Sequence, residues 1–258
     1  MKEKLESGIS VLYSGTPCQI DALNTYLGKT YDNLLTVDIV CHGVPNNHMF
    51  KDYITALEKK YNRKIYSFKF RDKKLGWGKN GSIDIICGSN KMNIKLWESA
   101  TPYLYYFGKG WLNRDSCYKC KYACSHRPAD ITLGDYWGIE KQHPEFLKKN
   151  VNEKMGISLV ISNTAKGEEY IEYIKNLTLI HSSIEKAKEA NNQLSYPSSK
   201  GKRNIILKDY LYGGWEYIDR KFEKNTLISK YSSFIKSIIP LKIKRYLKSN
   251  TTINKNSF

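Results

Sequence analysis

The segment ISVLYSGTPCQ, residues 9–19, decides the expected fold. Its apolar half, residues 9–13, predicts a short buried strand, and the Ser-Gly-Thr-Pro that follows predicts a loop. We expect a helix over residues 19–27, because Ile20, Leu23 and Leu27 then share one face. The local order is therefore strand, loop and helix, and Cys18 lies in the loop.

The same order returns at once along the chain. Residues 34–40, LLTVDIV, predict a second buried strand, and Cys41 begins the loop after it. We expect Asn46 or Asn47 to cap a helix that runs to about Lys60. Two successive strand–helix units predict an α/β fold with a parallel-sheet core. Both cysteine-bearing loops then follow the carboxyl ends of strands, the edge where open α/β sheets place ligands.

The middle of the chain changes character. Residues 64–70 alternate between apolar and polar, and residues 82–87 and 91–97 flank Gly88-Ser89-Asn90, a pattern typical of a hairpin. We therefore expect residues 64–110 to form a small antiparallel insertion.

The later part of the chain returns to the α/β pattern. We expect a strand over residues 156–163 and helices over residues 164–177 and 183–191. A loop over residues 195–201 then divides this region from a C-terminal helix, at about residues 204–222. The sequence thus predicts one domain over residues 1–200 and a basic helical extension over residues 201–258.

A run of cysteines, SCYKCKYAC at residues 116–124, carries the chemistry. Its C-x2-C-x3-C spacing lets one loop aim several sulfurs at one point, as metals with thiolate ligands require. Cys18 and Cys41 lie in loops stiffened by proline, so either can supply a fourth ligand. Cys87 ends an apolar strand and fits a packed free thiol. These cysteines indicate an iron–sulfur cluster, with Cys18, Cys41, Cys117, Cys120 and Cys124 as candidate metal ligands.

Zinc is the main competitor. Cys117, Cys120, Cys124 and His126 match a Cys3His structural zinc set. Against this site, His126 follows Cys124 by only two residues, and Cys18 and Cys41 are left without a role.

Polar residues after the cysteine run have two interpretations. Asp130 and Asp135 suit either a metal or cofactor hydroxyl, or turns beside a buried aromatic residue. Arg114 and Arg127 flank the cysteines and either stabilise a negatively charged cluster or lie on the surface.

Composition and charge indicate where the protein is located. The 258 residues carry a net charge of +17, of which residues 224–258 contribute eight Lys or Arg and no acid. No run approaches the roughly 20 apolar residues of a membrane span, and the start shows no secretory signal. We expect a cytoplasmic location, where clustered cysteines bind metals rather than form disulfides.

The basic tail either contacts an anionic membrane, on its inner face, or docks on the body. No nucleic-acid-binding module is visible.

Six ordered motifs give the chain a family resemblance. It resembles the coenzyme F-420 (deazaflavin) hydrogenase/dehydrogenase beta-subunit family, from about Ile9 to about Gly167. The motifs are SGTPCQ at 14–19, DIVCHGVP at 38–45, FRDKKLGW at 70–77, SCYKCKY at 116–122, DITLGDYWG at 130–138 and GISLVISNT at 156–164.

The resemblance implies an iron–sulfur flavoprotein with a 4Fe–4S cluster and FAD. It points to Cys18, Cys41, Cys117 and Cys120 as cluster ligands, and it ranks Cys124 lower. Our candidate cofactor-binding residues are Thr16, Asp130, Thr132 and Asp135. Longer members begin with a ferredoxin-like segment and a further α/β segment, so this chain resembles a short form.

The sequence therefore predicts an oxidoreductase component that relays electrons between a 4Fe–4S cluster, a flavin and a redox partner protein. The rival hypothesis is a non-catalytic accessory protein, stabilised by zinc or a cluster, that binds a partner enzyme, such as one of surface-polysaccharide synthesis.

Overall fold

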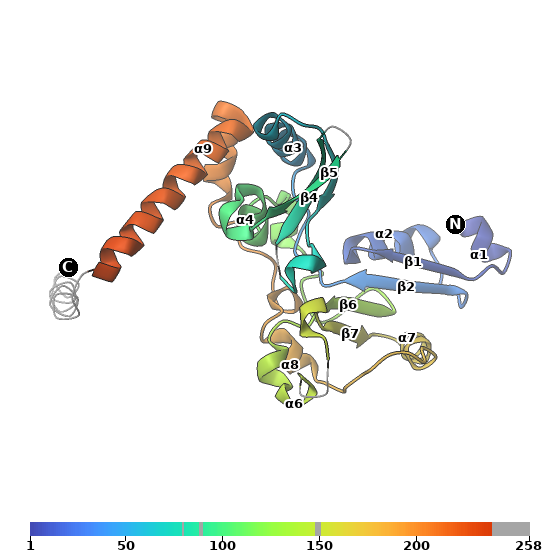
Figure 1. Cartoon of the computed structure of the whole chain (residues 1–258). Helices are drawn as coiled ribbons and strands as arrows, with labels where there is room; N and C mark the ends of the chain where they lie inside the picture. Colours follow the sequence, from blue (N-terminus) through green and yellow to red (C-terminus); the bar gives the residue numbers. More distant parts are fainter. Residues whose placement is uncertain (79, 88–89, 148–150, 239–258) are drawn as a thin grey trace, which may run out of the picture.

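The computed structural model of the protein describes residues 1–78, 80–87, 90–147 and 151–238 (Figure 1). One sheet has the strand order β1-β2-β6-β7. Its strands are β1 (Val11–Gly15), β2 (Leu34–Ile39), β6 (Ile131–Asp135) and β7 (Ser158–Ser162). β1, β2 and β6 run parallel, whereas β7 runs antiparallel to β6. The expected α/β class and parallel core are confirmed, with one antiparallel strand added at an edge.

The first strand–loop–helix unit follows from its sequence. Helix α2 (Pro17–Leu27) begins two residues earlier than expected, with Thr16 as its N-cap. The backbone N–H of Thr16 donates to Oε1 of Gln19 over 2.9 Å, which completes half of a capping box. Pro17 suits the first helical turn, because its missing N–H would have no helical partner there. Gly28 ends the helix with a φ of +70°, which favours glycine.

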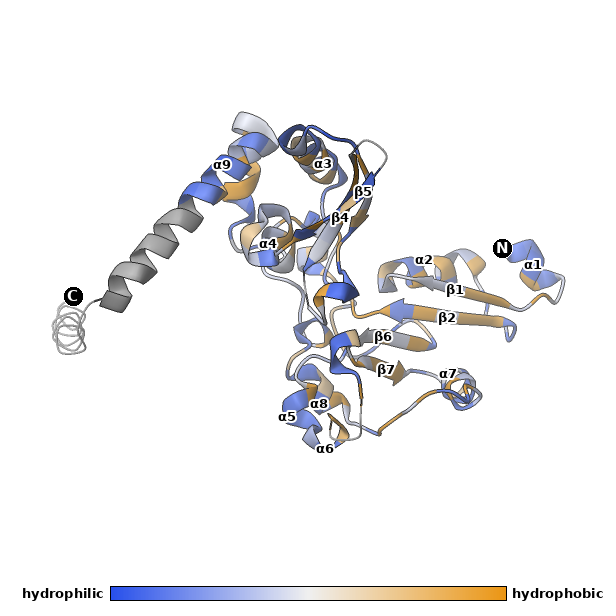
Figure 2. Cartoon of the chain, in the orientation of Figure 1, coloured by the Kyte–Doolittle hydropathy of each residue, from blue (hydrophilic) through white to orange (hydrophobic). Residues whose placement is uncertain are grey.

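Three helices flank the four-stranded sheet (Figure 1). They are α1 (Lys2–Glu6), α2 and α7 (Ala165–Glu172). Leu5 of α1 and Leu27 of α2 pack with Leu34 of β2 in one buried cluster. Figure 2 shows β2 as largely hydrophobic, as its central place in the sheet requires. At α7, a Cβ on Gly167 would lie 2.3 Å from the backbone oxygen of Asp130, so glycine lets this helix approach the sheet.

The expected antiparallel insertion is confirmed as a second sheet with the order β3-β4-β5. Its strands are β3 (Ile65–Lys69), β4 (Gly81–Cys87) and β5 (Asn90–Leu96). The predicted turn between β4 and β5 includes residues 88–89, which lie outside the described residues. Helices α3 (Asn47–Tyr61) and α4 (Pro102–Gly108) share an aromatic core with this sheet. The rings of Tyr53 and Tyr103 stack at its centre, 4.9 Å apart.

Short helices close the other end of the molecule. They are α5 (Ile139–Gln142), α6 (Pro144–Leu147) and α8 (Ile184–Lys188). Tyr136, Phe146 and Leu159 are buried together in the cluster that these helices form with β7. The predicted helices at 164–177 and 183–191 both exist but are shorter than expected.

The C-terminal helix α9 (Arg203–Ile238) is longer than its prediction. It is kinked at Gly213 and Gly214, whose backbone angles are not helical. Ile206, Trp215 and Ile218 are buried in the core with α3, so the first part of α9 belongs to the body. The later part projects away from it (Figure 1). Residues 239–258, which include most of the predicted basic tail, lie outside the described residues, and the domain division at residue 200 stays a prediction.

No described helix combines the length and the apolar character that crossing a membrane requires.

A carboxylate of α9 predicts how stability depends on pH. Burial raises the pKa of Asp219 to about 6, although Lys60 and a hydrogen bond from Trp215 oppose this shift and Glu223 and Glu216 add to it. Since the folded protein holds this proton more tightly than the unfolded chain, stability falls as pH rises from about 4 to about 6.

We therefore expect Asp219→Asn to raise the melting temperature at pH 7.5 and to leave it unchanged near pH 4. Asparagine keeps an acceptor for the Trp215 Nε1–H, which bonds Asp219 Oδ1 over 3.1 Å. Thermal unfolding across this pH range measures the difference. A shift of equal size at both pH values would show that the carboxylate charge is not its cause.

Candidate functional site

The parallel strands bring the predicted site residues to one edge of the sheet. β1, β2 and β6 lie side by side, with Gly15 opposite Asp38 and Ile39 opposite Leu133. The chain then leaves β1 toward Cys18, leaves β2 toward Cys41, and ends β6 at Asp135. The carboxyl edge of the sheet therefore carries two cysteine loops and one carboxylate, as the sequence indicates.

Four thiols meet at this edge from three segments of chain. Cys18 lies in the first turn of α2, and Cys41 lies in the loop after β2. Cys117 belongs to a short 3-10 helix, Asp115–Lys119, and Cys120 follows it. Burial raises the pKa of the Cys41 thiol, and Cys117, Cys18 and Cys120 are close enough to raise this pKa further.

Polar groups already point at these sulfurs. The backbone N–H of Val44 donates to Sγ of Cys117 over 3.4 Å. The Thr16 hydroxyl lies 3.1 Å from Sγ of Cys18, and a backbone hydrogen bond from Gly43 lowers the pKa of Cys41 against the effect of burial. The two backbone donors favour thiolates and tune the potential of a cluster that thiolates hold, whereas the Thr16 hydroxyl gives its own proton to Gln19 Oε1. Thr16, a predicted cofactor residue, thus lies beside a predicted metal ligand.

Cys124 does not join this arrangement. Its Sγ donates to two backbone oxygens of its own loop, those of His126 at 3.1 Å and Lys121 at 3.4 Å. Among the described residues, no three His, Cys, Asp or Glu side chains converge tightly enough to hold a single metal ion. This finding applies equally to the Cys3His zinc set and to the predicted cluster ligands, so the choice between zinc and a cluster stays a prediction.

A buried ion pair fastens the cysteine run to the sheet. Arg127 Nη2 lies 3.1 Å from Oδ1 of Asp38, and both side chains are almost fully buried, at 1% and 0% exposed. The same guanidinium donates to the backbone oxygens of Tyr122 at 2.6 Å and Ile39 at 2.7 Å. Burial raises the pKa of Asp38, and Thr132 and Arg127 oppose this shift. Arg127 is therefore not a surface residue, and its role beside a cluster stays a prediction.

Asn113 supports the Cys41 loop, although no local sequence pattern selects it. Its side chain is 1% exposed, and Nδ2 donates to the backbone oxygen of His42 over 3.0 Å. A Cβ on Gly43 would lie 2.1 Å from this Nδ2, and Gly43 has a φ of +114°. Glycine at this position therefore allows the close approach of the Asn113 side chain.

Phe107 and segments from the C-terminal part of the chain contact the loop that carries Cys41. His42 Nε2 donates to the Phe107 backbone oxygen over 2.9 Å, and Gln193 Nε2 donates to His42 Nδ1 over 3.3 Å. The Ser198 hydroxyl donates to the His42 backbone oxygen over 2.9 Å. At the start of α9, Arg203 donates to the Asn113 backbone oxygen and pairs with Asp115, each over 3.1 Å.

Asp135 anchors an aromatic group at the sheet edge. Trp77 Nε1 donates to Asp135 Oδ1 over 3.0 Å, and Arg71 pairs with Oδ2. The rings of Trp77 and Trp137 stack 4.9 Å apart, and the Arg71 guanidinium lies 5.5 Å from the Trp137 ring centre. This arrangement presents two indole rings and one cation near the ends of the parallel strands.

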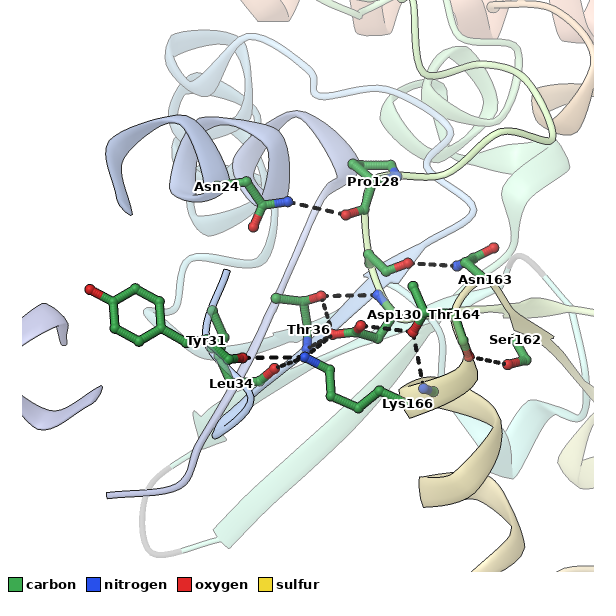
Figure 3. Close-up of polar contacts among 12 residues, drawn as sticks. Asn24, Tyr31, Leu34, Thr36, Pro128, Asp130, Ser162, Asn163, Thr164 and Lys166 are labelled. Carbon is green, nitrogen blue, oxygen red and sulfur yellow. Dashed lines mark hydrogen bonds and ion pairs between the residues drawn. The ribbon is translucent and has the colours of Figure 1, made fainter. Parts of the chain in front are cut away.

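The other two predicted cofactor residues face the interior of the fold. Asp130, just before β6, accepts hydrogen bonds from Thr36 and Thr164, and Lys166 Nζ lies 3.6 Å from it (Figure 3). Burial raises the pKa of Asp130, but these partners outweigh it and hold the pKa below its ordinary value. Thr132 is 0% exposed and accepts from Asn163 Nδ2 over 3.0 Å. The described contacts therefore give both residues a part in joining β2, β6 and α7.

Comparison with known families gives one match. The family described as coenzyme F420 hydrogenase/dehydrogenase, C terminus of the beta subunit, matches residues 9–187. This region contains all of the cysteines and all of the predicted cofactor residues. No curated protein matches the chain.

The buried ion pair predicts a large loss of stability when one partner is removed. Arg127→Leu leaves the Asp38 carboxylate buried without its counter-charge, so we expect the free energy of unfolding to fall by about 3–5 kcal/mol. Lys121→Leu is the control, because it removes the exposed Lys121–Asp21 pair and should change stability little. Urea denaturation measures both. Equal effects of the two substitutions would contradict the importance given to the buried pair.

Proposed function

Since the chain belongs to the family of C-terminal domains from the beta subunit of coenzyme F420 hydrogenase/dehydrogenase, we propose that it is an iron–sulfur component of an oxidoreductase. In this proposal it relays electrons between a 4Fe–4S cluster, a flavin and a reducible partner protein. The observation that supports the cluster most strongly is that Cys18, Cys41, Cys117 and Cys120 gather from three separate segments at one sheet edge.

The donor set fits a cluster better than a single ion. A 4Fe–4S cluster takes four thiolates and places its iron and sulfide atoms between them, so its ligands stand farther apart than those of one ion. Cys117, Cys18 and Cys120 lie close enough to Cys41 to raise its pKa, so the chain offers the four neighbouring thiols that this ligand set needs. Zinc would need tetrahedral ligands at bond lengths of about 2.3 Å to sulfur.

The residues around the thiols suit a group with negative charge. When bound, a 4Fe–4S cluster supplies one-electron transfer. The backbone N–H groups of Val44 and Gly43 donate to the sulfurs of Cys117 and Cys41, which stabilises their thiolates. Cys18 is exposed, whereas Cys41, Cys117 and Cys120 are half-buried. The Cys18 side is thus the side on which we place the redox partner.

The residues fit a flavin only in part. Thr16 and Asp135 lie at the carboxyl edge, and Asp135 contacts the Trp77–Trp137 stack, whose faces suit a planar ring. Asp130 and Thr132, in contrast, are hydrogen-bonded inside the fold and form no cradle with the other two. We therefore keep FAD as a proposal that rests on the family and derive no step through it.

Substitution of the cysteines tests the cluster. We expect Cys18→Ser, Cys41→Ser, Cys117→Ser and Cys120→Ser, each purified without oxygen, to lose most of their iron and visible absorption. Cys124→Ser is the matched control and should keep both, because its sulfur bonds to backbone oxygens of its own loop.

The Cys124→Ser control also distinguishes the cluster from the rival zinc site. Zinc bound in stoichiometric amount and lost in Cys124→Ser, with no iron, would contradict the electron relay and support a structural site. A cluster lost equally in all five variants would contradict the assignment of the four ligands.

A further inference from the structure

A pocket lies apart from the cysteine edge, with a volume of about 440 Å³. It is bounded by the edge strand β7, by α7 and by the segment that precedes α8. Phe146, Leu159 and Ile180 give it an apolar lining, and the five described free cysteines are not among its lining residues. A concave, mostly apolar space with a few polar groups at one place is the usual form of a small-molecule site.

Those polar groups form a chain of hydrogen bonds with the geometry of an activated nucleophile. Ser182 Oγ lies 2.8 Å from His143 Nε2, and His143 Nδ1 lies 3.2 Å from Glu145 Oε1. The Tyr136 hydroxyl lies 2.7 Å from Ser182 Oγ. Glu145 can accept only from an Nδ1–H, so Nε2 accepts the Ser182 O–H and Ser182 accepts from Tyr136. Nucleophile, base and orienting carboxylate therefore stand in the order that acyl transfer requires.

The fold holds His143, the base, more firmly than it holds Ser182 and Glu145. His143 is 5% exposed, and its backbone N–H donates to Ile139 at the start of α5 over 2.8 Å. Its ring packs 5.8 Å from that of Tyr136. Ser182, in contrast, is exposed at the pocket, where a substrate can reach it. The Glu145 side chain is 67% exposed, so water screens the electrostatic attraction between its carboxylate and the His143 imidazole.

We propose that Ser182, His143 and Glu145 form a second active site, which hydrolyses a small ester with an apolar acyl group. Ser182 Oγ forms a bond to the acyl carbon while its proton passes to His143 Nε2. The ester C–O bond then breaks, and the same proton goes to the leaving alcohol. Water, with His143 again as base, releases the acid and restores Ser182. The Tyr136 hydroxyl, 2.7 Å from Ser182 Oγ, holds the nucleophile in place beside His143.

A fluorophosphonate probe tests this proposal on the full chain, independently of any cluster. We expect the probe to label Ser182, as peptide mapping of the native protein by mass spectrometry would show. Ser182→Ala should abolish labelling, and His143→Gln should slow it at least about 100-fold, the lower range for loss of a general base. Glu145→Gln should slow it less, because that carboxylate is exposed.

Ser195→Ala provides the matched control, since Ser195 is an exposed serine outside the pocket lining. It should be labelled like the native protein, and hydrolysis of p-nitrophenyl butyrate should follow the same order among the variants. Native protein that reacts no faster than heat-denatured protein would overturn the proposal. Label mapped to another residue, or kept in Ser182→Ala, would overturn it as well.

Discussion

The buried ion pair between Asp38 and Arg127 is the interaction on which the candidate cluster site depends. A charge removed from water must keep its partner, so the two residues fix the positions of their chain segments. Asp38 lies three residues before Cys41, and Arg127 lies seven residues after Cys120. The guanidinium also holds the backbone of Tyr122 against that of Ile39. One pair thus sets the end of β2 and the cysteine run in register with each other.

The site extends beyond the part of the chain that matches the family. The match ends at residue 187, yet Gln193, Ser198 and Arg203 contact the loops that carry Cys41 and Cys117. Buried residues of α9, such as Trp215, join the core of the antiparallel sheet. The beginning of the C-terminal region therefore belongs to the folded unit and helps to hold the site in place.

Local patterns in the sequence predicted most of the fold and part of the site. The strand–loop–helix units and the cap at Asn46 depend on neighbouring residues, so they could be predicted directly. The interior role of Asp130 and the burial of Asn113 depend on residues distant in sequence, which no local pattern shows. The sulfur of Cys124 bonds backbone oxygens of its own loop, which its spacing does not show, and its role as a metal ligand stays a prediction. The predicted C-terminal helix already crossed the kink at Gly213, and what was missed is the continuation of α9 from residue 223 to Ile238.

The most direct test of the central claim is the content of iron, acid-labile sulfide and zinc in the native chain purified without oxygen. Four thiols arranged at one sheet edge predict about four iron and about four sulfide per chain, with little zinc. Those numbers would establish that the edge of the parallel sheet holds a 4Fe–4S cluster. One zinc per chain without sulfide, or no bound metal after reconstitution with iron and sulfide, would contradict the account.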